Sequence, residues 1–200
     1  MVDEYKIKAD KDRVIGEVSP LIYGHFIEHI GRCIYGGIYE EGSPLSDERG
    51  FRKDVLEAVR RLSPTVLRWP GGCFADGYHW KDGIGPRDER PVKFDLHWGG
   101  WGKEEETNRF GTDEFIEYCR AVSAEPYFTV NVGSGTAEEA AQWVEYCNRE
   151  GNTLYAKKRA KNGHPEPHNV VFWGIGNEID VLNHPGEIGC MAADDYARTF

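Results

Sequence analysis

Residues 169–180, with the sequence Asn-Val-Val-Phe-Trp-Gly-Ile-Gly-Asn-Glu-Ile-Asp, decide the fold that this chain is predicted to adopt. The apolar run at 170–173 predicts a buried strand, and the glycines that follow it lead directly to Asn177 and Glu178. In parallel α/β folds, ligands bind beyond the carboxyl ends of the strands. Glu178 is therefore predicted to lie at a site where chemistry takes place.

Strands and helices alternate on the N-terminal side of this stretch. Apolar residues at helical spacing between 51 and 62 predict a helix that Pro64 ends, and Thr112 and Thr136 can each cap a further helix. Glu139 has the capping-box spacing from Thr136. The predicted order is a strand at 21–26, a helix at 51–62, a strand at 65–69, a helix at 112–122, a strand at 127–132, a helix at 136–147, a polar loop and the strand at 170–173. This alternation indicates a parallel sheet with crossover helices.

Four such units suit one half of a (β/α)8 barrel, the TIM barrel, which typically needs ~250 residues. A complete doubly wound sheet is the alternative, but no glycine run matches a phosphate loop or a dinucleotide fingerprint. In the run that starts at Gly174, Ile179 stands where the third glycine should be. A last helix, predicted at 192–200, reaches the final residue, so we expect an α/β half-barrel, strands 1 to 4, that is truncated.

The composition excludes several classes of protein. A net charge of −10, from 24 basic and 34 acidic residues, argues against nucleic-acid and membrane partners. The basic cluster at 157–159 is interpreted as a solvated helix face. Five cysteines form no Cys-x-x-Cys pair, so neither a disulfide framework nor a zinc site is expected. The N-terminus lacks the apolar stretch of a signal peptide, which favours a cytoplasmic location. No cofactor or metal is predicted.

Polar residues follow each predicted strand. They are His25, Glu28 and His29 after the first strand, Arg68 at the second, Asn131 at the third, and Asn177 and Glu178 at the fourth. Any one of them could be structural, since Arg68 could pair with a carboxylate and Asn131 could cap a turn. Together they predict a binding or catalytic face at the carboxyl edge of the sheet.

Two further patterns have competing interpretations. His25-Phe-Ile-Glu-His29 matches a metalloprotease pattern, but that pattern requires a helix, and this segment follows a strand between glycines. The loop at 70–109 is rich in tryptophan, and aromatic platforms beside carboxylates suit the apolar faces of sugars. Core packing is the expected role of Trp69 and Trp80. Trp98 is the best candidate for contact with a substrate.

Six motifs resemble those of the α-L-arabinofuranosidases of glycoside hydrolase family 51. They are the sequences at 23–29, 36–44, 67–72, 78–86, 107–115 and 173–178, and they occur in order along nearly the whole chain. The resemblance implies a barrel of the retaining-glycosidase clan at 19–200. It also implies that residues 1–18 contribute a strand to a β-sandwich domain.

The resemblance also implies roles for particular residues. Glu178 matches the general acid/base, and Asn177 matches the amide that binds the 2-hydroxyl of the sugar. Glu28 and Arg68 match residues that line the arabinose pocket. Cys73 stands where many members have Asn, and the stretch at 179–189 departs from the family pattern. The second carboxyl that a retaining glycosidase needs, the nucleophile, is expected beyond residue 200.

The implied substrates are arabinan, arabinoxylan and small arabinosides, from which the family removes terminal arabinofuranosyl groups. A homo-oligomer, often a hexamer, is implied as well. Two alternatives remain open. One is a β-xylosidase or endoglucanase activity, and the other is a non-catalytic fragment that binds carbohydrate or serves assembly. For the 200-residue chain alone we predict no double-displacement activity, because the nucleophile is missing.

Overall fold

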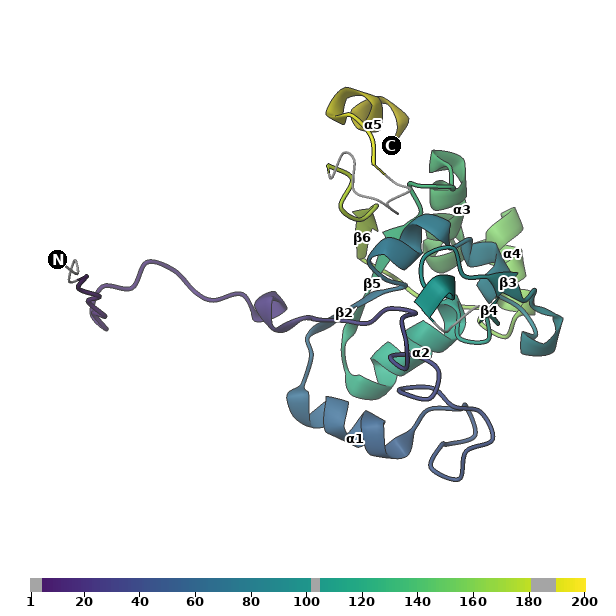
Figure 1. Cartoon of the computed structure of the whole chain (residues 1–200), viewed down its shortest axis with the longest axis horizontal. Coiled ribbons are helices and arrows are strands. Elements are labelled where there is room, and N and C mark those ends of the chain that lie inside the picture. The colour runs from purple at the N-terminus through teal and green to yellow at the C-terminus, as the bar shows by residue number, and fades with distance from the viewer. Residues whose placement is uncertain (1–4, 102–104, 181–189) are drawn as a thin grey trace.

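A parallel sheet forms the centre of the computed structural model, which describes residues 5–101, 105–180 and 190–200 (Figure 1). The four strands of this sheet lie in the order β1 (His25–Phe26), β2 (Val66–Trp69), β5 (Glu125–Val130) and β6 (Phe172–Ile175). These four strands follow one another along the chain in the same order, and the two strands between β2 and β5 form a separate small hairpin that is described below. The predicted α/β fold with a parallel sheet is confirmed.

The register of the sheet brings the carboxyl ends of its strands to one edge. Phe26 lies opposite Arg68, and Arg68 lies opposite Tyr127. Phe128 then lies opposite Trp173 in the last strand. Residues that follow β1, β5 and β6 therefore lie at the same edge of the sheet as the carboxyl end of β2. This is the edge where the sequence predicts the site.

Helices connect the strands and cover the sheet. They are α1 (Lys53–Leu62), α2 (Thr112–Val122), α3 (Ala137–Asn148), α4 (Leu154–Lys161) and α5 (Ala193–Thr199). The loop between β2 and α2 contains the 3-10 helices η2 (Cys73–Gly77), η3 (Trp80–Gly83), η4 (Arg87–Glu89) and η5 (Gly99–Trp101). It also contains an antiparallel hairpin of β3 (Lys93–Phe94) and β4 (Glu105–Glu106).

The first predicted strand is shorter than expected. Residues Pro20–Tyr23 form the 3-10 helix η1, and only His25–Phe26 pair with β2. The physical reason lies at the start of the segment, where Ser19 Oγ accepts the N–H of Leu21 at 3.3 Å and proline occupies the first helical position. The apolar run alone did not distinguish this turn from a strand.

Two of the predicted helix starts can be compared with the structure. The prediction of Thr112 as a cap is wrong, because α2 begins at Thr112 and Gly111 is the preceding residue. The carboxylate of Glu114 accepts the N–H of Gly111 at 2.9 Å instead. At α3 the prediction is confirmed, since Thr136 Oγ accepts the N–H of Glu139 at 3.0 Å.

Helix α4 lies in the segment that the sequence analysis treated as a polar loop. The expected solvated face at 157–159 is wrong for Arg159, which is 1% exposed. Its guanidinium donates to the carbonyl oxygens of Tyr146, His164 and Pro165 and so holds α4 against α3. Nothing in the sequence Lys-Lys-Arg indicates that the arginine is buried and hydrogen-bonded to backbone carbonyl groups.

Trp69 is the centre of the hydrophobic core. Its indole is fully buried, stacks on Phe115 of α2 and meets Phe128 of β5 edge-on. Trp143 of α3 packs against both Trp69 and the ring of Trp80. The expected core roles of Trp69 and Trp80 are confirmed.

Residues 5–18 contain no helix or strand and extend away from the sheet (Figure 1). Their apolar side chains are exposed, with Ile7 at 99% and Ile15 at 96%. In the part of the chain that the structure describes, residues 5–18 pair with no strand, so the predicted sandwich strand stays a prediction. Among the residues described, no helix combines the length and the apolar character needed to cross a membrane.

The buried His168 predicts how stability depends on pH. Its Nε2 lies 3.2 Å from Asp113 Oδ1, and its Nδ1 lies 3.4 Å from the guanidinium of Arg120, which suits a neutral ring that donates at Nε2. Burial lowers the pKa of His168 below its ordinary 6.5, although Asp113 opposes this shift and His164 and Arg120 reinforce it. The unfolded chain therefore binds more protons below about pH 6.5, and the free energy of unfolding should decrease on acidification.

Urea unfolding between pH 7.5 and pH 5 tests this expectation. His168→Gln, which cannot take up the proton, should show a shallower decrease of the unfolding free energy over this range than the wild type. Equal slopes for the two proteins would contradict the assignment to His168.

Candidate functional site

Glu28 is the buried carboxylate of the candidate site. It follows β1, is 8% exposed, and accepts the N–H of Phe74 at 3.1 Å through Oε1. Burial raises the pKa of the Glu28 carboxyl, against smaller opposing effects of the Phe74 N–H, the Trp98 indole and Arg68. A partly desolvated carboxylate of this kind is a strong acceptor for the hydroxyl groups of a ligand.

Two glycines make room for this carboxylate. A Cβ at Gly71 would lie 2.7 Å from Glu28 Cγ and 2.8 Å from Oε1, and a Cβ at Gly72 would lie 3.2 Å from Oε1. These glycines follow β2 directly, after a cis peptide bond between Trp69 and Pro70. The Gly-Gly pair of the 67–72 motif is thus explained by the close approach of the backbone to Glu28.

Gly71→Ala should therefore displace the Glu28 side chain. If Glu28 lines an arabinose pocket, as the resemblance of the 67–72 motif implies, the full-length variant should bind L-arabinose about tenfold more weakly than the wild type, since a shift of about 1 Å at a positioning residue can cost up to 10²-fold. Isothermal titration measures the effect. Gly100→Ala is the matched control, because a Cβ there meets nothing within 4 Å. If both variants bind equally well, Glu28 is not a ligand-positioning group.

Arg68 reaches the residues after the last strand and lies close enough to Glu28 to oppose the rise in the pKa of its carboxyl. It lies in β2, and its guanidinium donates to Asn177 Oδ1 at 3.4 Å, across a sequence separation of 109 residues. The guanidinium also lies over the ring of Phe26 in β1, 4.4 Å from the centroid. A guanidinium, an amide and a carboxylate thus converge at the carboxyl edge of the sheet, as the sequence predicted for Glu28, Arg68 and Asn177.

Glu178 follows Asn177 with its backbone in the left-handed region, at φ +48°. Its side chain is exposed among the residues described. A general acid of a retaining glycosidase needs a raised pKa, which burial can provide, and the described part of the chain does not bury Glu178. Residues 181–189 of the divergent loop lie outside the described residues.

Trp98 and Cys73 both belong to the loop that follows β2. Trp98 is half-buried against the core, and its indole N–H lowers the pKa of Glu28 without reaching hydrogen-bond geometry. Cys73 begins η2, one residue before the Phe74 N–H that Glu28 accepts. Both residues therefore lie near Glu28.

His29 and Glu106 were missed as a pair by the sequence analysis. His29 is fully buried, its Nδ1 lies 2.9 Å from Glu106 Oε2, and its Nε2 accepts the indole N–H of Trp69 at 2.9 Å. An indole N–H can only donate a hydrogen bond, so Nε2 of His29 is an acceptor and carries no hydrogen. The ring hydrogen is therefore on Nδ1, and this N–H donates a hydrogen bond to Glu106. His29 directly follows Glu28, and Trp69 directly follows Arg68. The hydrogen bond between the His29 and Trp69 rings therefore fixes the end of β1 relative to the end of β2.

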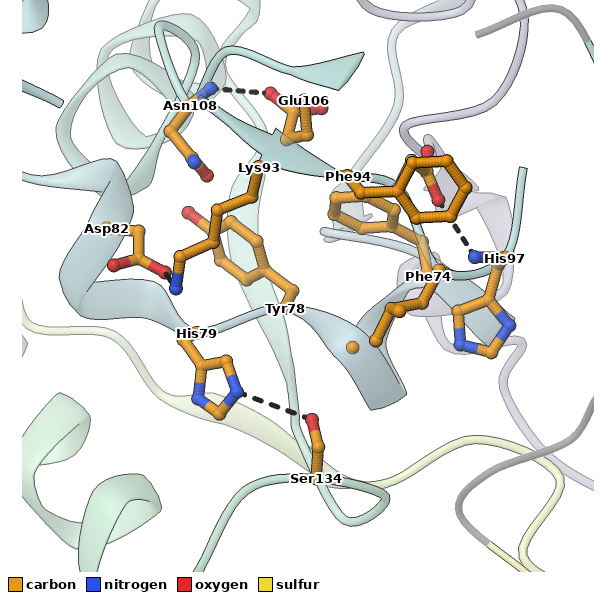
Figure 2. Close-up of a pocket in the computed structure, with 13 residues that line it drawn as sticks. Phe74, Tyr78, His79, Asp82, Lys93, Phe94, His97, Glu106, Asn108 and Ser134 are labelled. Carbon is orange, nitrogen blue, oxygen red and sulfur yellow. Dashed lines mark hydrogen bonds and ion pairs between the residues drawn. The ribbon is translucent and has the colours of Figure 1, made fainter. Parts of the chain in front are cut away.

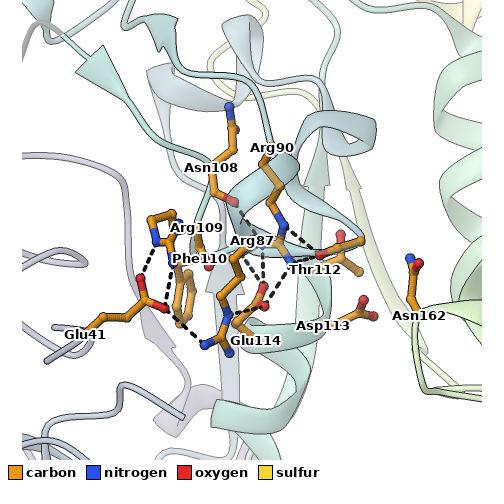
Figure 3. A network of polar contacts seen from close by, with 12 residues as sticks. Glu41, Arg87, Arg90, Asn108, Arg109, Phe110, Thr112, Asp113, Glu114 and Asn162 are labelled. Carbon is orange, nitrogen blue, oxygen red and sulfur yellow. Dashed lines mark hydrogen bonds and ion pairs between the residues drawn. The ribbon is translucent and has the colours of Figure 1, made fainter.

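A network of arginines holds the long loop in place (Figure 3). Arg90 forms a bidentate pair with Glu114 of α2, and Arg87 donates to Glu114 and to Glu41. Arg109 joins the network through Glu41 and Asp88. These arginines bond to protein carboxylates, so they support the loop that carries Trp98.

Asn131 and the histidines of the zinc pattern do not join the site. Asn131 Oδ1 accepts the N–H groups of Ser134 and Gly135, so it caps the turn after β5. His25 is exposed in β1, and both ring nitrogens of His29 have protein partners. Within the described ranges no group of three His, Cys, Asp or Glu side chains is arranged to hold a metal.

The fold and the gathered polar groups define an α/β protein with a site suited to a polyhydroxylated ligand. Residues 58–186 match the sequence profile of the family described as "Alpha-L-arabinofuranosidase 1 domain", and the chain belongs to that family.

Curated relatives and solved structures agree with this assignment. The probable α-L-arabinofuranosidase C of Aspergillus flavus is 55% identical over 88% of this chain and 34% of its own length. The intracellular exo-α-(1→5)-L-arabinofuranosidase of Halalkalibacterium halodurans is 45% identical over 95% of this chain and 37% of its own length. The structure of the family 51 enzyme of Thermotoga petrophila matches with a TM-score of 0.86 and 65% identity, over 94% of this chain and 37% of that one. The chain therefore spans about a third of the length of these proteins.

Proposed function

We propose that the full-length protein is a retaining glycoside hydrolase that releases terminal non-reducing α-L-arabinofuranosyl residues from arabinan, arabinoxylan and arabinosides. The observation that carries the proposal is the convergence of Glu28, Arg68 and Asn177 at one edge of the parallel sheet. The names of the relatives support it, since each is an arabinofuranosidase.

In the proposed mechanism Glu178 is the general acid/base. It protonates the leaving oxygen and then deprotonates the water that hydrolyses the glycosyl-enzyme. Asn177 binds the 2-hydroxyl of the sugar, and its contact with Arg68 keeps the amide oriented. Glu28, Arg68, Cys73 and Trp98 bind the rest of the arabinose ring. The nucleophile comes from outside residues 1–200 and lies about 5–5.5 Å from Glu178, the separation that a retaining enzyme requires.

We propose that residues 19–200 are the first half of the (β/α)8 barrel and that residues 1–18 add a strand to a β-sandwich. The two outer strands of the described sheet support the proposal that further strands of a barrel lie beside them. The side chains of Phe26 in β1 and Ile175 in β6 are 46% and 42% exposed, and outer strands with exposed apolar residues are normally covered or paired. A cytoplasmic location and a homo-oligomeric state are part of the same proposal. The bacterial relative described as intracellular supports the first of these.

Substrate preference tests the proposed function. The purified full-length protein should hydrolyse aryl α-L-arabinofuranosides faster than aryl β-xylosides, with retention of configuration at the anomeric carbon. A clear preference for the xyloside or for a glucan chain would favour the β-xylosidase or endoglucanase alternative.

A non-catalytic role in carbohydrate binding or assembly is the second candidate for the 200-residue chain by itself. The exposure of Glu178 among the described residues favours it for this part of the protein. The chain alone should bind arabinose without turnover. Turnover by the chain alone that disappears in Glu178→Ala would contradict this expectation.

A further inference from the structure

Glu106 is a buried carboxylate of the β3–β4 hairpin and is 3% exposed. Its Oε2 accepts the Nδ1–H of His29 at 2.9 Å, and its Oε1 accepts the hydroxyl of Tyr35. Oε1 also accepts the backbone N–H of Asn108 at 2.7 Å (Figure 2). His29 and Tyr35 both follow β1 along the chain, so this carboxylate bonds the hairpin to the segment after the first strand.

The ring of His29 links Glu106 to a donor that holds Glu28. It stacks on the ring of Phe74, with the ring centroids 4.6 Å apart and the planes at 17°. The backbone N–H of Phe74 is the donor that Glu28 Oε1 accepts at 3.1 Å. His29 also follows Glu28 directly, and its own N–H donates to the carbonyl oxygen of Pro70 at 3.2 Å. The imidazole is therefore coupled to Glu28 both through the backbone and through Phe74.

The hairpin that Glu106 anchors also carries Trp98. Trp98 lies between β3 and β4, and Glu106 pairs with Lys93 at the base of the hairpin. The indole of Trp98 lies close enough to Glu28 to oppose the rise in pKa that burial causes in that carboxyl. A displacement of the hairpin would therefore move the indole relative to Glu28.

We propose that Glu106 and His29 are positioning residues, whose hydrogen bond keeps the sugar-binding carboxylate of Glu28 in place. They do so by holding two donors beside this carboxylate, the Phe74 N–H and the Trp98 indole. The proposal rests on the proposed function, which makes Glu28 a sugar-binding group. Both positioning residues are almost fully buried, so they act on the sugar through Glu28 and do not touch it.

Glu106→Gln in the full-length protein tests the pair. The single amide oxygen cannot accept from His29 on one side and from Tyr35 and Asn108 on the other, so one side of the network is lost. We expect kcat/KM for an aryl α-L-arabinofuranoside to decrease by about tenfold. In a Glu28→Gln background the same change should cost less than about twofold, because the carboxylate that the pair positions is already gone.

The pH profile separates positioning from a general loss of stability. Burial raises the pKa of Glu28, and the two donors oppose this rise, so their displacement should raise the pKa further. In Glu106→Gln the decrease of kcat/KM at acidic pH should therefore begin at a higher pH than in the wild type. Arg68 and His29 also oppose the rise, and neither is replaced in the variant.

Asp113→Asn is the matched control. Asp113 is likewise a buried carboxylate, 5% exposed, which accepts the hydroxyl of Tyr146 at 2.7 Å and lies 3.2 Å from Nε2 of His168. None of these contacts involves Glu28, so the control should lower the melting temperature and keep the wild-type kcat/KM and pH profile. If Glu106→Gln does not fold, Glu106→Asp keeps the charge but withdraws the carboxylate by one methylene, and it should show the same changes to a smaller extent.

The outcomes separate the positioning role from the proposed function. If the wild-type protein does not hydrolyse the aryl arabinofuranoside, the proposed function is wrong and the positioning role fails with it. If it does, wild-type kinetics and pH profiles in the Glu106 variants overturn only the positioning role. Equal losses in Glu106→Gln and Asp113→Asn also overturn it, as does an equal effect of Glu106→Gln in the wild-type and Glu28→Gln backgrounds, because Glu106 would then not act through Glu28.

Discussion

Glu178→Ala in the full-length protein should lower kcat on arabinan oligosaccharides by about 10²–10⁴-fold, the contribution of a positioned general acid/base. The alkoxide that leaves from an oligosaccharide is a poor leaving group and needs the proton of Glu178. A dinitrophenyl arabinofuranoside has a leaving group that needs no proton, so its first step should be nearly unaffected. Steady-state kinetics and the burst of dinitrophenolate measure the two steps separately.

Added azide distinguishes this role from a structural one. Azide attacks the glycosyl-enzyme without a general base, so it should accelerate turnover of the dinitrophenyl substrate by Glu178→Ala and yield an arabinofuranosyl azide of retained configuration. Asp180→Asn, two residues further along and also exposed, is the matched control and should leave both steps unchanged. Without rescue by azide, or with equal losses in the two variants, the acid/base would have to be another residue.

The parallel sheet could be predicted because its strands and helices carry local signals. The apolar spacing between 51 and 62 corresponds to α1, and Thr136 caps α3 as its sequence indicates. Where the structure differs, a local alternative competes with the pattern. Pro20 and the Ser19 hydroxyl stabilise a 3-10 turn at the start of the first apolar run, and α4 forms around the buried Arg159.

The candidate site was predicted in part for the same reason. Glu28, Arg68 and Asn177 each follow or lie in a strand, so strand prediction alone brings them to one edge. The pair of His29 and Glu106 could not be found this way, since 77 residues separate them and β4 has only two residues. Long-range side-chain pairing of this kind leaves no periodic pattern in a single sequence.

Glu28→Gln should separate sugar binding from stability. The amide keeps an acceptor for the Phe74 N–H but loses the charge beside Arg68, so kcat/KM for an aryl arabinofuranoside should decrease by about 10²-fold, the range for a charged hydrogen bond. Burial raises the pKa of the Glu28 carboxyl, so its ionised form is less stable in the folded protein than in the unfolded chain. The variant should therefore melt at the same temperature as the wild type at pH 7, or at a higher one.

The pH profile gives a second, independent measurement of the same residue. If the ionised carboxylate binds the sugar, kcat/KM of the wild type decreases as the pH falls through the raised pKa of Glu28, above the ordinary carboxyl value of 4.5. Glu28→Gln has no carboxyl group to protonate, so the decrease of its kcat/KM on the acid side of the pH profile, the acid limb, should occur at lower pH. The exposed Glu105→Gln should keep both the rate and the limb of the wild type. A Glu28→Gln protein that loses activity together with its melting temperature, and keeps the wild-type acid limb, would show that Glu28 serves the fold and does not bind the sugar.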